Sequence, residues 1–198
     1  MAKRRTVSNP LALAVLAELT IAPMHPYEMG RRLREQGKDR NIKYNRSSLY
    51  MVVEQLRKAG FVAERETVRD TQRPERTVYA LTGAGRTELD DWMRELVAEP
   101  QHEYPAFGVA LSLLAALPIE ESAELLGRRL TALDERIDAG RAQLHEAAGS
   151  GLHPMFVIEE EYALALLTAE RRYTEHLIGQ LGDPEFGRTL EEFLRRTE

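Results

Sequence analysis

A chain of 198 residues, 43% of them hydrophobic, can bury one or two cores of ordinary size. It has no cysteine, which excludes disulfides, thiolate metal ligands and cysteine nucleophiles. It also lacks any apolar run of about 18 residues, so we expect no membrane span and a cytoplasmic location.

The net charge of −5 combines two opposite parts. Residues 1–80 carry 16 Lys and Arg against 9 Asp and Glu, a net of +7, whereas residues 81–198 carry 11 against 23, a net of −12. A basic part joined to an acidic part indicates that the basic part faces a polyanion. Solvated acidic helices would explain the second part without any special function.

Two short helices are expected first. The stretch Ser8-Asn9-Pro10 combines a capping residue with a proline at the first helical position, which predicts a helix start. Residues 11–22 are apolar almost all round, so this helix should be central to a core. Pro26 opens a second helix that should end near Gln36. The basic start Lys3-Arg4-Arg5 is either a mobile arm on DNA or without a role.

A third helix is expected before Gly60, capped by Asn45 or Ser47. Leu49, Val52, Val53 and Leu56 form its apolar stripe. The start of the opposite face is rich in hydrogen-bond donors: Lys43, Asn45, Arg46, Ser47, Ser48 and Tyr50. Together with the free N–H groups of a helix start, these donors suit phosphate and the base edges of a major groove. An ordinary amphipathic helix with a solvated polar face is the alternative.

Residues 61–68 and 76–81 are rich in β-branched and aromatic residues and are separated by a polar turn, which predicts a β-hairpin. Three helices followed by a hairpin are the order of a winged helix-turn-helix. Arg69, Arg73 and Arg76 lie where the tip of the wing would meet a DNA backbone, although a charged tip can also be merely solvated.

Thr82 should cap a fourth helix that carries Leu89, Trp92 and Leu96 on one face. The proline-bounded segment 99–105 reads as a linker, so we expect two domains, residues 1–99 and 105–198. The expected fold is mainly α, with an N-terminal winged helix-turn-helix and a C-terminal helical, coiled-coil-like dimerisation domain.

The second domain should contain helices at 106–117, 120–148, 155–181 and 185–195. The spacing of Leu126, Leu130, Leu133, Ile137 and Leu144 is that of a coiled-coil seam. Tyr162, Leu166, Ala169 and Tyr173 share one face of the next helix. Two long amphipathic helices bury their stripes most economically against a second copy, which predicts a C2 dimer. An intramolecular helical hairpin is the alternative.

The sequence resembles the PadR family of bacterial transcriptional regulators. The motifs that carry the resemblance are Leu11–Leu16 (LALAVL), Pro23–Met29 (PMHPYEM), Ser47–Tyr50 (SSLY), Leu56–Val62 (LRKAGFV), Arg73–Thr82 (RPERTVYALT) and Ala84–Arg86. The region after residue 105 is similar to the C-terminal domain of the virulence-activator-like members. Two positions depart from the family pattern, namely Pro26, where glycine is common, and Met51, where proline is frequent.

The resemblance implies a homodimeric repressor that binds a pseudo-palindromic operator in double-stranded DNA and is released by a small aromatic or drug-like effector. It places Tyr27 and Tyr50 on backbone phosphates, the start of the third helix in the major groove, and Arg73 and Arg76 in the wing. From its forked donors, Arg46 is the residue that we expect on guanine, with a backbone phosphate as the equal alternative. The alternative is a regulator whose C-terminal domain binds a protein partner without any small-molecule effector.

An effector pocket would draw on Trp92, Tyr104, Phe107 and Tyr173, although a lone tryptophan on an apolar stripe is more often part of the core. The five histidines are scattered, so neither a metal site nor a cofactor is expected. No nucleophile elbow, phosphate-binding glycine loop or cofactor fingerprint occurs, and we therefore do not expect an enzyme.

Overall fold

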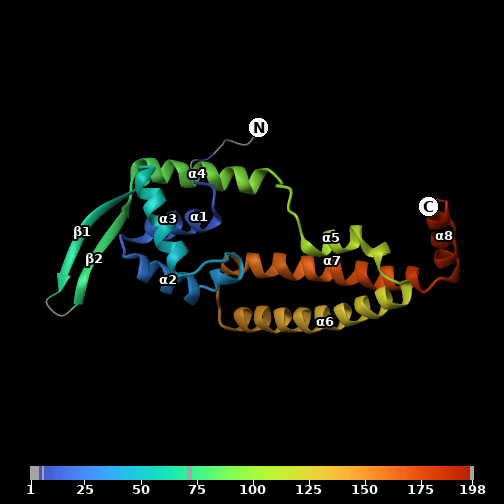
Figure 1. Ribbon diagram of the computed structural model, residues 1–198. Helices are drawn as coiled ribbons and strands as arrows, with labels where there is room; N and C mark the ends of the chain where they lie inside the picture. Colours follow the sequence, from blue (N-terminus) through green and yellow to red (C-terminus); the bar gives the residue numbers. More distant parts are fainter. Residues whose placement is uncertain (1–4, 6, 71–72, 197–198) are drawn as a thin grey trace. The chain divides into compact units, whose positions relative to one another are not determined.

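The computed structural model describes residues 5, 7–70 and 73–196, without the side chains of 66–70, 73–76, 191 and 194. The chain forms two compact units, Met1–His102 and Glu103–Glu198 (Figure 1). None of the described helices is both long and apolar enough to cross a membrane.

The first unit contains α1 (Pro10–Ile21), α2 (Pro26–Glu35), a 3-10 turn η1 (Lys38–Arg40), α3 (Arg46–Lys58) and α4 (Gly83–Ala98). Side chains cap the helix starts where the sequence predicts them. The Asn9 side chain accepts a hydrogen bond from the Leu11 amide at 2.9 Å, and Thr82 Oγ1 accepts one from the Gly85 amide at 3.0 Å. Each bond satisfies an amide that has no partner within its helix, so these boundaries follow from local chemistry.

The core of the first unit is built around α1, as predicted. Leu11, Val15 and Leu16 of α1 are fully buried, as is the whole apolar stripe of α3 at Leu49, Val52, Val53 and Leu56. Burying each of these side chains contributes about 1.5–3 kcal/mol, so this cluster supplies most of the attraction between the helices. The polar start of α3 is left on the surface as a consequence.

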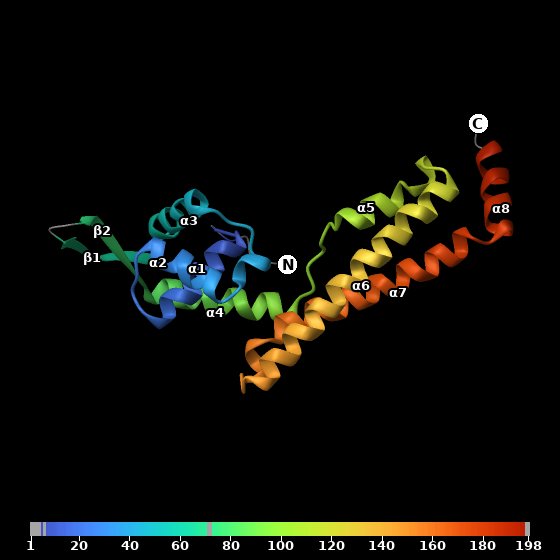
Figure 2. The ribbon, with the colours of Figure 1, turned by 90° about the horizontal axis from the view of Figure 1, so that it is seen from below.

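The hairpin consists of β1 (Val62–Asp70) and β2 (Arg73–Leu81), paired antiparallel from Val62 opposite Leu81 to Asp70 opposite Arg73. Its strands are longer than the sequence pattern predicts, because backbone pairing continues through polar residues that carry no hydrophobic signal. The hairpin extends away from the helices (Figure 2). The main chains of Met24 and Tyr79 form an isolated antiparallel bridge between its root and the segment before α2.

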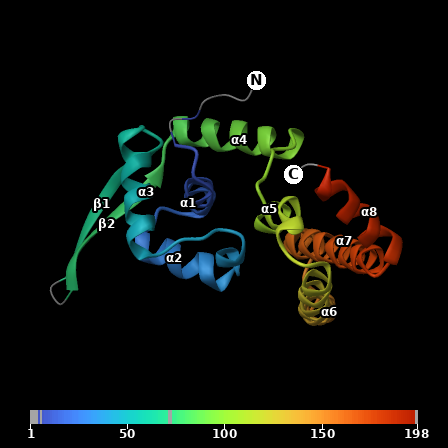
Figure 3. The ribbon, with the colours of Figure 1, turned by 45° about the vertical axis from the view of Figure 1, so that its right-hand side comes forward.

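The second unit contains α5 (Ala106–Ser112), η2 (Leu114–Ala116), α6 (Ile119–Gly149), η3 (Pro154–Phe156), α7 (Ile158–Leu181) and α8 (Pro184–Arg195). The long helices α6 and α7 form an antiparallel hairpin and lie side by side (Figures 2 and 3). Ion pairs link them, with Arg129 Nε 2.7 Å from Glu170 Oε1 and Arg171 Nε 2.6 Å from Asp134 Oδ1.

The prediction that the α6 seam awaits a second copy is wrong at its centre. Leu126, Leu133 and Ile137 are between 2% and 4% exposed in the single chain, and Leu126 packs with Leu177 and Leu181 of α7. The intramolecular hairpin therefore uses this stripe. Heptad spacing shows that a stripe needs a covering helix, and it does not say which helix supplies the cover. Leu130 and Leu144 are half-buried.

Candidate nucleic-acid interface

The start of α3 is held by a reciprocal cap. The Ser48 amide donates to Asn45 Oδ1 at 2.9 Å, and the Asn45 amide donates to Ser48 Oγ at 2.8 Å. Asn45 is thus the N-cap, and Ser47 is not. Capping accounts for the side chains of Asn45 and Ser48 without any ligand, so their expected contact with DNA stays a prediction.

The cations at this end of α3 are available to a ligand. Lys43 and Arg46 are exposed, and the Arg46 guanidinium lies 5.8 Å from the centre of the Tyr50 ring. At the other end of the helix, Arg57 donates two hydrogen bonds to Glu54 and thereby holds the pKa of that carboxyl below its usual value. The two ends of one helix therefore differ, because only the second end has its positive charge neutralised by a neighbour.

Two tyrosines were expected beside these cations, Tyr27 of α2 and Tyr50 of α3. Tyr27, in the first turn of α2, is exposed, and Tyr50 is half-buried and forms a T-shaped pair with the His25 ring, with 5.9 Å between ring centres. Ser47 is exposed on the same turn of α3 as Arg46. The structure thus groups Arg46, Ser47 and Tyr50 on one surface, as the sequence pattern predicts.

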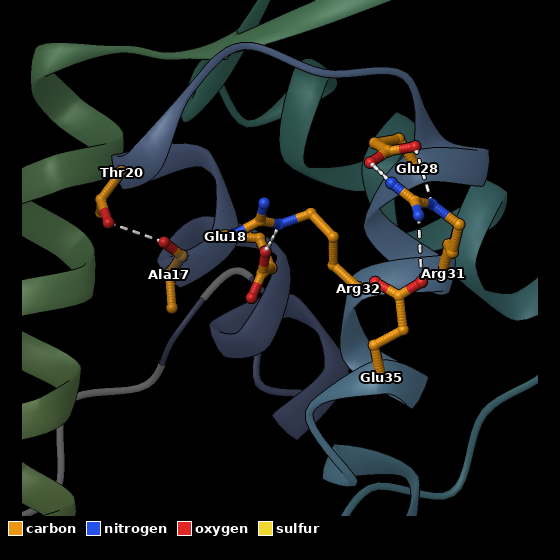
Figure 4. Close-up of polar contacts among 7 residues, drawn as sticks. All are labelled: Ala17, Glu18, Thr20, Glu28, Arg31, Arg32 and Glu35. Atoms are coloured by element: carbon orange, nitrogen blue, oxygen red, sulfur yellow. Dashed lines mark hydrogen bonds and ion pairs between the residues drawn. The ribbon is translucent and has the colours of Figure 1, made fainter. Parts of the chain in front are cut away.

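Charge on α2 is largely compensated within the helices. Arg31 pairs with Glu28 and Glu35 along α2, and Arg32 Nε lies 2.6 Å from Glu18 Oε2 of α1 (Figure 4). The Glu18 side chain is almost completely buried, so this pair joins two helices. Because these cations already have acidic partners, they add less positive potential than the charge count of residues 1–80 suggests.

The wing residues are described only in part. Arg73 and Arg76 belong to β2, and their side chains lie outside the part of the chain that the structure describes. Arg69 likewise belongs to β1 without a described side chain. Arg65 of β1 is also an exposed cation of the wing. The sequence pattern does not single it out, because it lies within a predicted strand and outside the predicted turn. Burial raises the pKa of Tyr79, nearer the root of β2.

The residues expected to bind an effector belong to both units, and each is described within its own unit. Trp92 is only 5% exposed, and the Arg5 guanidinium covers its ring at 5.2 Å, which makes it a core residue. In the second unit the Phe107 ring lies under the Arg129 guanidinium at 3.6 Å. Tyr104 and Tyr173 are exposed. The prediction that Trp92 is a core residue is therefore confirmed. The prediction that its ring is accessible to an effector is wrong for this conformation.

The suggestion of a mobile basic arm is wrong for Arg5. Its side chain is 4% exposed and hydrogen-bonds to Glu88 and Glu95 of α4. Lys3 and Arg4 lie outside the described residues. Nothing in the sequence pattern indicates this pairing, because the partners are more than eighty residues apart. Among the described residues, no three His, Asp or Glu side chains form a group that could hold a metal ion.

The sequence matches one family model, and the fold is similar to several solved structures. Residues 13–91 match the model of the transcriptional regulator PadR-like family. The fold is similar to Bacillus subtilis PadR in complex with operator DNA, with a TM-score of 0.71 and 18% identity over 87% of this chain and 99% of that one. No curated protein matches the sequence.

Two further solved structures share the fold. Bacillus subtilis PadR in complex with p-coumaric acid has a TM-score of 0.66 and 17% identity, over 90% of this chain and 100% of that one. The smu.1604c protein of Streptococcus mutans has a TM-score of 0.59 and 18% identity, over 87% and 99%. These similarities cover both units of the chain.

Proposed function

We propose that this chain, which belongs to the PadR-like family of transcriptional regulators, is a homodimeric repressor that binds a pseudo-palindromic operator and releases it when a small aromatic molecule binds. The observation that carries the DNA-binding part is the start of α3, where exposed Lys43 and Arg46 adjoin the free amides of a helix N-terminus. In this proposal residues 1–99 bind DNA and residues 105–198 dimerise, in the cytoplasm where the genome lies.

The proposed contacts divide into two kinds. Tyr27, Tyr50, Lys43 and Ser47 meet backbone phosphates and set the register of the protein on the duplex. Arg46 reads a guanine in the major groove, because its fork matches the O6 and N7 acceptors of that base. Asn45 and Ser48 act through the cap that fixes the start of α3. Arg73 and Arg76 of the wing meet the neighbouring backbone.

The proposed dimer uses the outer face of α7. Tyr162, Leu166 and Tyr173 are between 49% and 63% exposed and follow one another at spacings of four and seven residues. Such a row is a second coiled-coil seam, on a helix whose other face already packs on α6. A shallow cavity of about 460 Å³, lined in part by Leu144 and Leu164, lies beside it and could take side chains of a partner helix. Symmetric pairing would set two α3 helices to read half-sites about one helical turn apart.

A small aromatic effector is supported by the p-coumaric acid complex of Bacillus subtilis PadR. In this chain Tyr104, Phe107 and Tyr173 are the aromatic candidates in the second unit, whereas Trp92 is a buried residue of the first core. The second candidate function is a regulator whose acidic C-terminal helices bind a protein partner. It is favoured by the exposed apolar rows on those helices.

The deciding experiment is fluorescence anisotropy with a labelled fragment from upstream of the protein's own gene, against a random fragment, at 50 and 200 mM salt. Preference for the native fragment, with affinity falling tenfold or more as salt rises, supports the proposal. Arg46→Ala should lower the preference by about fivefold to 100-fold, the range for one bidentate base contact. Arg57→Ala is the matched control on the same helix, because that arginine is already paired with Glu54.

Arg73→Ala should weaken both fragments alike, as expected of a phosphate contact. Binding by Arg46→Ala that equals the parent would contradict the contact map. No DNA binding at low salt would contradict the regulator proposal and favour protein interaction. Once the operator is bound, release by p-coumaric acid or another phenolic acid tests the effector, and release by none of a screened set favours the protein-partner alternative.

A further inference from the structure

The turn between α1 and α2 is fixed to the wing by main-chain hydrogen bonds. The Met24 amide donates to the Tyr79 carbonyl at 3.0 Å, and the Tyr79 amide donates to the Met24 carbonyl at 3.1 Å. The main chain immediately before His25 is therefore fixed to the root of β2. The extended conformation of His25 also suits its position before Pro26.

The His25 ring contacts both α2 and α3. Its Nδ1 accepts a hydrogen bond from the Tyr27 amide at 3.1 Å, which caps α2. Because a main-chain amide only donates, Nδ1 must be unprotonated, and in the neutral ring the proton lies on Nε2. The same ring forms a T-shaped pair with the Tyr50 ring of α3, with 5.9 Å between ring centres and an interplanar angle of 73°.

Tyr50 is therefore held from two directions. The His25 ring contacts it from the segment before α2, and the Arg46 guanidinium lies 5.8 Å from the centre of its ring. A T-shaped pair stabilises the orientation of a half-buried ring, because the quadrupoles of the two rings favour this arrangement over a face-to-face one. The hydroxyl at the end of that ring is the group proposed to meet a phosphate.

We infer that His25 is a positioning residue for DNA binding: its ring sets the ring of Tyr50 relative to the wing, while its cap on the Tyr27 amide stabilises α2. The inference rests on the proposed function, since it assigns His25 to the geometry of that interface. His25 itself need not touch DNA. It joins the three DNA-facing elements of the unit, because α2, α3 and β2 meet at Met24 and His25.

Two substitutions separate the two contacts of His25. His25→Asn keeps a side-chain acceptor that caps α2 but removes the ring, so the melting temperature should stay close to that of the parent. His25→Phe keeps a ring against Tyr50 but removes the acceptor, so the melting temperature should fall by about 4–8 °C. Operator affinity, measured below both melting temperatures, should fall about threefold to tenfold in His25→Asn and stay within about twofold in His25→Phe.

A double-mutant cycle with Tyr50→Phe tests whether His25 acts through the tyrosine hydroxyl. In the Tyr50→Phe background, His25→Asn should change operator affinity by less than about twofold, because the group that it positions is gone. A general structural role would lower affinity equally in both backgrounds, and that result would overturn the inference.

The other outcomes are equally distinct. If the parent binds the operator and His25→Asn binds it with the same affinity, the inference is overturned and the proposed function stands. A parent that binds no DNA at low salt overturns the proposed function, and the positioning role falls with it.

Discussion

Gly85 allows the start of α4 to pack directly on the backbone that leads into the wing. A Cβ at this position would lie 2.0 Å from the Phe61 carbonyl oxygen and 2.9 Å from Leu81 Cδ1. The Phe61 oxygen cannot easily move, because it accepts hydrogen bonds at 3.0 Å from both the amide and the hydroxyl of Thr82. Gly85→Ala must therefore displace α4 from the hairpin root or break the Thr82 cap.

The magnitude follows from the overlap. Real Cβ atoms essentially never lie within 3.0 Å of another heavy atom, so a Cβ that would lie 2.0 Å from the carbonyl oxygen requires a backbone shift of about 1 Å or more. Overpacking that side chains can relieve costs about 1–3 kcal/mol, and here the obstacle is backbone. We expect Gly85→Ala to lower the free energy of unfolding by about 3 kcal/mol or more, which corresponds to a melting temperature about 12 °C lower or more.

Gly83→Ala is the matched control two residues earlier in the same helix. A Cβ at Gly83 meets no atom within 4 Å, and alanine favours a helix over glycine by up to about 1 kcal/mol. This variant should unfold at the same urea concentration as the parent or at a higher one. The fluorescence of Trp92, the only tryptophan and a buried residue of α4, reports the transition directly. A Gly85→Ala variant within about 0.5 kcal/mol of the parent would refute the close packing.

Three further outcomes are expected. Burial raises the pKa of Tyr44 in the folded state, so the stability that its neutral form contributes is complete below about pH 10 and is lost as pH rises through the folded pKa. Tyr44→Phe should reduce this loss of stability at high pH, measured by urea titrations at pH 8 and pH 11. An unchanged loss would contradict the prediction. Leu166→Glu should convert the proposed dimer to a helical monomer in light scattering and circular dichroism, and a persistent dimer would place the interface elsewhere. Arg5→Met leaves the carboxylates of Glu88 and Glu95 without their cation, so it should lower the free energy of unfolding by about 3 kcal/mol at pH 7, and a loss within about 0.5 kcal/mol would contradict a stabilising role for this ion pair.

Local chemistry in the sequence was sufficient to locate the helices of the first unit. Asn9 and Thr82 identify helix starts because a side-chain oxygen satisfies amides within three residues of itself. The stripe from Leu49 to Leu56 identifies the buried face of α3 because a helix repeats every 3.6 residues. The exposed cations on the opposite face follow from the same periodicity, and so does the candidate interface.

Contacts between segments that are distant in the sequence are known only from the tertiary structure. The stripe at Leu126 requires a covering helix, and only the folded chain shows that α7 of the same molecule supplies it. An arginine is expected at the surface, but Arg5 is buried, because two acidic side chains of α4 offset the cost of removing its charge from water. His25 has no pattern of its own in the sequence, because its contact with Tyr50 joins elements that only the core brings together. Periodicity and capping are properties of a few adjacent residues, whereas burial and charge pairing depend on which surfaces meet.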